Sequence, residues 1–96
     1  MVSIDQLRDI IERLHGCKAQ WRDSADVKEE FGDQTVWEGR VYIFDIQGHP
    51  KTNTCYAWAS SVEHSTQAKF HAVLAIPPVT TAADAVRATI VHDYKK

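Results

Sequence analysis

The hydrophobic pattern of residues 37–46 changes partway along the segment, and this change is the strongest structural signal in the chain. Residues 37–41 alternate between apolar and polar side chains, which is typical of a β-strand with one buried face. Residues 41–44 are apolar without a break, as in a strand that is buried on both faces. The pattern therefore predicts a strand over about residues 36–46, with one end that needs cover on both sides.

Helices are predicted at the two ends of the sequence. Ser3 and Gln6 form a capping box at the start of the first helix, and Gly16 ends it. The apolar stripe of this helix consists of Ile4, Leu7, Ile10, Ile11 and Leu14. The second helix is predicted to start near Thr80 or Thr81, and its apolar stripe is lighter.

Three further strands are predicted between the helices, over about residues 24–31, 55–62 and 68–76. Pro77-Pro78 ends the last of them, because proline cannot donate a hydrogen bond to a neighbouring strand. The connections are short, which favours antiparallel neighbours. We therefore expect a single α+β domain over residues 1–96. It is a four-stranded antiparallel meander flanked by amino- and carboxy-terminal helices (α-β-β-β-β-α), arranged as a two-layer sandwich.

Apolar residues on both faces are predicted at one end of the whole sheet. In a meander, residues 42–46, 55–58 and 73–76 meet at that end, and all three segments are apolar on both faces. The two helices could lie on opposite faces, or both could lie on one face with a second subunit on the other. The second face could also bind a ligand. We favour both helices on one face, which leaves the other face open.

Strand parity assigns a set of side chains to this open face. If Trp37 and Phe70 point toward the helices, the residues one position away along each strand point outward. The predicted surface consists of Arg40, Tyr42, Phe44, Lys69 and His71. Aromatic side chains among basic ones are typical of the centre of a protein interface. The sequence thus favours a non-enzymatic interaction module that binds a protein partner or self-associates as a homodimer.

Composition and charge narrow the class of partner. The formal net charge is −2, which argues against a nucleic-acid binder that relies on phosphate contacts. RNA binding by stacking on sheet aromatics stays an alternative. Residues 22–38 hold six acidic and two basic side chains, so they could meet a basic partner, although such segments are more often solvated. No apolar stretch approaches the roughly 18 residues of a membrane-spanning helix, so we expect no membrane partner.

A small ligand-binding protein or enzyme is the alternative function, with a pocket formed by His49, Cys55 and Trp58. Cys55 beside a histidine could act as a nucleophile, although a cysteine within an apolar strand is more often a buried filler. His15 and Cys17 could supply two metal ligands, and folding could bring His49 and Cys55 near them. The sequence holds no C-x-x-C or H-E-x-x-H pattern. We therefore predict no metal site, no cofactor and no catalytic residue.

Two further observations concern the origin of the chain. It has two cysteines and no amino-terminal signal pattern, which favours a reducing, cytoplasmic location. The segments Trp37-Glu38-Gly39-Arg40-Val41, Gly48-His49-Pro50, Tyr56-Ala57-Trp58 and Asp84-Ala85-Val86-Arg87-Ala88 resemble those of a group of small bacterial proteins without a known function. The resemblance covers roughly residues 25–92. It implies a bacterial, cytoplasmic, single-domain protein and carries over no activity, cofactor or site residue.

Overall fold

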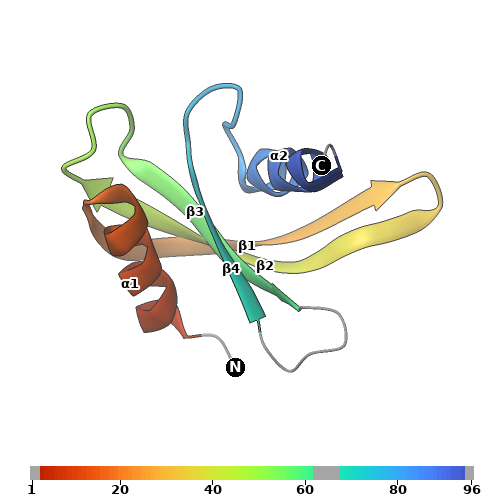
Figure 1. The fold of residues 1–96 in the computed structure, drawn as a ribbon, viewed down its shortest axis with the longest axis horizontal. Coiled ribbons are helices and arrows are strands. Elements are labelled where there is room, and N and C mark those ends of the chain that lie inside the picture. Colours follow the sequence, from red (N-terminus) through yellow and green to blue (C-terminus); the bar gives the residue numbers. More distant parts are fainter. Residues whose placement is uncertain (1–2, 62–67, 95–96) are drawn as a thin grey trace.

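The computed structural model describes residues 3–61 and 68–94, which form two helices and an antiparallel sheet (Figure 1). The elements are α1 (Ile4–His15), β1 (Lys18–Phe31), β2 (Gln34–Gln47), β3 (Thr54–Ser61), β4 (Ala68–Leu74) and α2 (Ala82–Tyr94). Within the described residues the strands follow one another across the sheet in the order β1-β2-β3-β4. The prediction of an α+β fold with an antiparallel sheet is confirmed. None of the described helices has the length and apolar character needed to cross a membrane.

The two helices cover opposite faces of the sheet. Side chains that pack with α1 are Phe44, Ile46, Cys55 and Ala57, and those that pack with α2 are Val27, Val41, Tyr56 and Trp58. Successive side chains of a strand point to opposite faces, so residues 55–58 are buried alternately under one helix and the other. The sheet therefore needs cover on both sides, as the sequence predicts. The expectation that both helices lie on one face, and with it the two-layer sandwich, is wrong.

β1 begins at Lys18, about six residues earlier than the sequence indicates. Its pairing with β2 shifts by one residue between Trp21 and Asp23, so Arg22 is an extra residue in β1. Such a bulge reverses which side chains face which side of a sheet. Ala19, before the bulge, packs toward α1, whereas Ala25, after it, packs toward α2. One long strand thereby contributes to both cores.

α1 is held to both outer strands of the sheet by hydrogen bonds as well as by its buried face. Leu7 and Ile11 are fully buried. The Glu12 carboxylate accepts a hydrogen bond from the backbone N–H of Ala19 in β1 at 2.9 Å. The His15 Nε2 lies 3.3 Å from the backbone carbonyl of Ala72 in β4, and because a carbonyl only accepts, the imidazole is the donor. The predicted capping box is present at Ser3, and Gly16 ends the helix at a φ of 61°.

α2 packs closely on the opposite face because its inner positions are small. Ala82, Ala85 and Val86 are buried against the sheet. The Tyr56 hydroxyl donates to the carbonyl of Thr80 at 3.1 Å, which fixes the chain just before the helix. Farther along, the guanidinium of Arg87 lies 3.1 Å from the largely buried carboxylate of Glu29 in β1.

The start of α2 is capped by a short hydrogen-bond network around Asp84. Its carboxylate accepts from the backbone N–H of Thr80 at 3.1 Å and from the Thr80 hydroxyl at 3.0 Å. The Thr81 hydroxyl in turn accepts from the backbone N–H of Asp84 at 3.1 Å. The backbone hydrogen bond and then the hydroxyl hydrogen bond from Thr80 hold the pKa of Asp84 below its ordinary value. The helix therefore starts close to Thr80 and Thr81, as the sequence predicts.

The sheet is continuous at one end and divided at the other. β2 pairs with β3 only where Tyr42–Asp45 lies opposite Thr54–Ala57. By contrast, β1 pairs with β2 along its whole length. Beyond the shared region the β1–β2 ribbon and the β3–β4 ribbon diverge (Figure 1). On the α2 side, Trp37 and Trp58 meet with ring centroids 6.2 Å apart. The β1–β2 ribbon consequently extends away from the rest of the sheet.

Phe44 tests the placement of α1. Because this ring is fully buried between α1 and the sheet, Phe44→Ala should lower the free energy of unfolding by about 3–5 kcal/mol. Arg40→Ala changes an exposed side chain on the same strand and should stay within about 0.5 kcal/mol of the parent. Denaturant midpoints measure both. Equal midpoints for the two variants would contradict this packing.

Asp84 should make the stability of the folded protein depend on pH. Since its pKa is lowered in the folded state, its stabilising effect is present above the unfolded-state pKa and is lost as the pH falls through the folded-state pKa. We expect the stability difference between the parent and Asp84→Asn to be largest near neutral pH and to shrink below about pH 4. Thermal unfolding across the pH range measures it. Asp33→Asn, in the β1–β2 turn, controls for net charge, and a pH-independent difference at Asp84 would contradict the prediction.

Candidate binding surface

The structure does not bring the five residues of the predicted open face together. Arg40, Tyr42 and Phe44 alternate along β2 on the face that α1 covers. Lys69 and His71 lie on the opposite face, where the His71 ring stacks on Trp58 with centroids 5.1 Å apart. Phe44 is fully buried and contributes no surface. The prediction of one open face formed by these five residues is therefore wrong.

The alternation of side chains within each strand was predicted correctly. The error lies in the assumption about which face of β4 matches which face of β2. The sequence interpretation placed Trp37 and Phe70 on the same face. In the structure Trp37 packs with the α2 core and Phe70 with the α1 core. Arg40 and Tyr42 do share a face, as predicted, but their companion on β4 is Phe70 and not His71.

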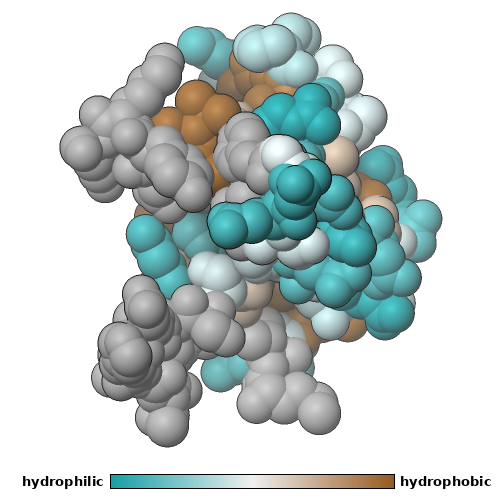
Figure 2. Space-filling model, turned by 90° about the vertical axis from the view of Figure 1, so that its right-hand side faces the viewer, coloured by the Kyte–Doolittle hydropathy of each residue, from teal (hydrophilic) through white to brown (hydrophobic). Residues whose placement is uncertain are grey.

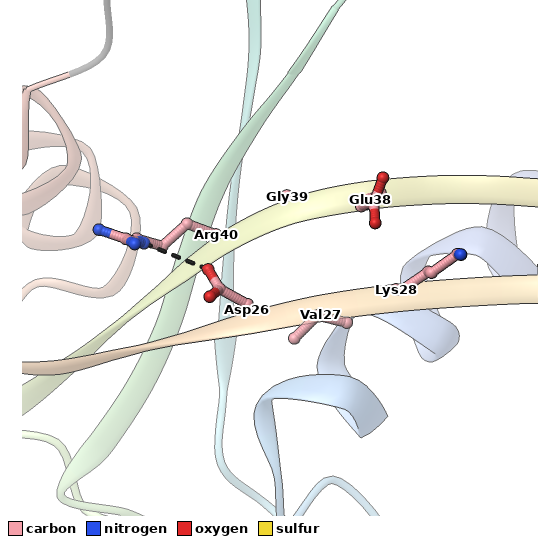
Figure 3. Close-up of a pocket in the computed structure, with 6 residues that line it drawn as sticks. All are labelled: Asp26, Val27, Lys28, Glu38, Gly39 and Arg40. Carbon is pink, nitrogen blue, oxygen red and sulfur yellow. Dashed lines mark hydrogen bonds and ion pairs between the residues drawn. The ribbon is translucent and has the colours of Figure 1, made fainter.

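A part of the α1-side face lies beyond the reach of α1, and we name it the hairpin surface. It consists of four charged residues, Asp26, Lys28, Glu38 and Arg40, bordered by the half-buried ring of Tyr42, the next residue of β2 on the same face. Asp26, Val27, Lys28, Glu38, Gly39 and Arg40 line a shallow depression of about 400 Å³ there (Figure 3). Figure 3 shows the Val27 side chain pointing away from the charged groups, toward α2. Seen from the side of the β1–β2 turn, the described surface is largely hydrophilic (Figure 2).

The charges of the hairpin surface alternate in sign along and across the strands. Asp26 stands opposite Arg40 and Lys28 opposite Glu38 in the β1–β2 register. The Arg40 Nε lies 3.3 Å from the Asp26 carboxylate, and the Lys28 Nζ lies 3.4 Å from Glu30. All these side chains are at least half exposed, so each pair contributes little to stability. The charged groups are thus positioned by the strands and stay accessible to a partner.

His49, Cys55 and Trp58 do not form the alternative pocket. Cys55 faces α1 and Trp58 faces α2, and both are buried. His49 lies in the β2–β3 loop, where its Nδ1 accepts from the backbone N–H of Lys51 at 3.1 Å and its ring is 6.4 Å from that of His15. Two of the rings that a base-stacking platform could use are covered as well, since Phe44 lies beneath α1 and Trp58 beneath α2.

The chemistry of Cys55 follows from its burial. Burial, and secondarily the nearby Cys17 thiol, raise the pKa of Cys55 to about 12. A thiol with this pKa is protonated at neutral pH and is a poor nucleophile. Cys17 is also buried, and both cysteines are free. In residues 3–61 and 68–94, no three side chains of His, Cys, Asp or Glu gather closely enough to hold a metal ion.

Comparison with known proteins finds no protein-family model, no curated protein and no solved structure that matches the chain. The resemblance to small bacterial proteins therefore stays a prediction.

Sequence reasoning missed Asp26 and Lys28 as members of a surface with Arg40. The available signal was the acidic segment 22–38, in which Asp26, Lys28 and Glu30 are charged at every second position. The sequence does not reveal which residues of β2 stand opposite this segment, because the β1–β2 pairing shifts by one residue between Glu29 and Glu30. Only this irregularity brings acid opposite base on the same face.

Cys55 provides a test of this part of the structure. Because its thiol is buried and has a raised pKa, it should react with iodoacetamide at pH 8 far more slowly than a model thiol, and rapidly once denaturant unfolds the chain. Peptide mapping by mass spectrometry separates Cys55 from Cys17. Labelling of Cys55 in the native protein at the rate of a model thiol would contradict its placement and revive the nucleophile hypothesis.

Proposed function

We propose that the protein is a non-enzymatic interaction module that binds a protein partner through the hairpin surface. The observation that carries the proposal is an uncovered area of sheet that combines alternating charges with the half-buried ring of Tyr42. Aromatic residues beside arginine are enriched at protein interfaces. Self-association through this surface, which the sequence predicts, is one form of the proposal.

The way the surface is supported favours binding. On the reverse side of the same ribbon, Val27 and Val41 are buried against α2. The charged side chains therefore project from strands that are held in place by packing against α2 on the opposite face. A surface that is ordered before binding loses less conformational freedom on association.

Arg40 is the charged residue best suited to a partner. Its Nε approaches Asp26, and among the described residues its two terminal nitrogens form no hydrogen bond or ion pair. A guanidinium can bind a carboxylate through two parallel hydrogen bonds. An acidic side chain of the partner can thus be held without breaking the contact to Asp26.

A cytoplasmic location belongs to the same proposal. Cys17 and Cys55 are both free and buried in the α1 core. Unpaired cysteines are the usual state in a reducing compartment.

Site-specific photo-crosslinking tests the proposal. Replacing Tyr42 by benzoylphenylalanine keeps an aromatic ring at the border of the hairpin surface, and we expect a discrete adduct to another protein chain after irradiation of intact host cells. The matched control is the same substitution at Trp21, which is 45% exposed and lies near the other end of β1. A missing adduct at Tyr42, or equal adducts at both positions, would contradict binding through the hairpin surface.

A further inference from the structure

The four charges of the hairpin surface form a square in which neighbours always differ in sign. On β1, Asp26 is followed on the same face by Lys28. On β2, Glu38 is followed on the same face by Arg40. The register places Asp26 beside Arg40 and Lys28 beside Glu38. Like charges therefore occupy the diagonals of the square.

Such a square is complementary to a copy of itself turned face to face. Consider a two-fold axis that lies just above the sheet and parallel to it, runs across the strands and passes over the centre of the square. Rotation about this axis brings Arg40 over Glu38 of the second copy and Asp26 over Lys28. Because an isologous interface repeats each contact twice, four attractive contacts form and no repulsive one.

The groups that would meet across this axis have unused hydrogen-bonding capacity. Within residues 3–61 and 68–94, the side chain of Glu38 has no hydrogen bond or ion pair, and it is exposed. Arg40 binds Asp26 through Nε alone. The Glu38 carboxylate of one copy can therefore accept hydrogen bonds from the terminal nitrogens of Arg40 of the other copy, while Arg40 keeps its contact to Asp26.

We infer that the partner bound by the hairpin surface is a second copy of this chain, packed face to face with reciprocal Arg40–Glu38 and Asp26–Lys28 contacts. The inference rests on the proposed function and names its partner. Tyr42 follows Arg40 on the same face of β2, so its ring extends the contact with apolar surface. Because the contacts between the charges are solvent-accessible, the dimer should weaken as salt is added.

Sedimentation equilibrium at about 100 μM chain tests for the dimer. The parent should dimerise at low salt, and its dissociation constant should rise by about tenfold or more when salt screens the charges. A monomer at low salt would overturn the inference. The crosslink at Tyr42 then decides the proposed function separately: an adduct to a different protein preserves it, and the absence of any adduct removes it too.

A matched pair of variants tests the surface itself. Asp26→Lys with Glu38→Arg makes the square entirely basic, and Lys28→Glu with Arg40→Glu makes it entirely acidic. Each variant alone should be monomeric, and an equimolar mixture should form a heterodimer. All four positions are exposed, so both variants should keep the parent circular dichroism spectrum. If either variant still forms homodimers, or the mixture stays monomeric while the parent dimerises, another surface is used and the inference fails.

A double exchange decides the direction of the axis. Arg40→Glu combined with Glu38→Arg keeps every contact attractive for an axis across the strands, so this variant should dimerise. For an axis along the strands, the same variant would place acid over Asp26 and base over Lys28. Loss of dimerisation in this variant would overturn the reciprocal Arg40–Glu38 arrangement.

Discussion

The structure depends on the burial of β3 on both faces. Residues 55–58 direct alternate side chains into two separate cores, and all four are buried. A strand in this position cannot be left with one face in water, because burying apolar surface is the main favourable contribution to folding. One helix on each side meets this requirement. The two helices cover different parts of the sheet. The α1-side face of the β1–β2 ribbon is therefore uncovered and can carry charged side chains.

Much of this arrangement is visible in the sequence. The uninterrupted apolar run at residues 41–44 indicates two-sided burial, and Ser3, Gln6 and Gly16 locate α1. These signals are local, since they depend on the spacing of residues within one element. The choice of face for each helix is a different kind of information. It depends on which positions of separate strands stand side by side, and spacing within a strand does not contain that register.

Two one-residue irregularities show why the candidate surface was harder to predict than the fold. The extra residue at Arg22 lets β1 change its buried face, and the shift between Glu29 and Glu30 sets the pairs Asp26–Arg40 and Lys28–Glu38. Neither position carries a glycine or proline that would mark a bulge. A shift of one residue moves every following side chain to the other face, so the spacing along β1 does not reveal which of its charged residues share a surface with Arg40.

The hydrogen bonds from α1 to the outer strands have a consequence for aggregation. The bond from the Ala75 N–H to the Thr54 carbonyl fixes the β3–β4 pattern, in which Ala72 directs its backbone groups away from β3. His15 occupies the carbonyl of Ala72, and Glu12 occupies an N–H of β1 at the opposite margin of the sheet. Exposed strand edges are the usual templates for uncontrolled strand addition between molecules. A single helix thus makes both margins poorer templates for such addition.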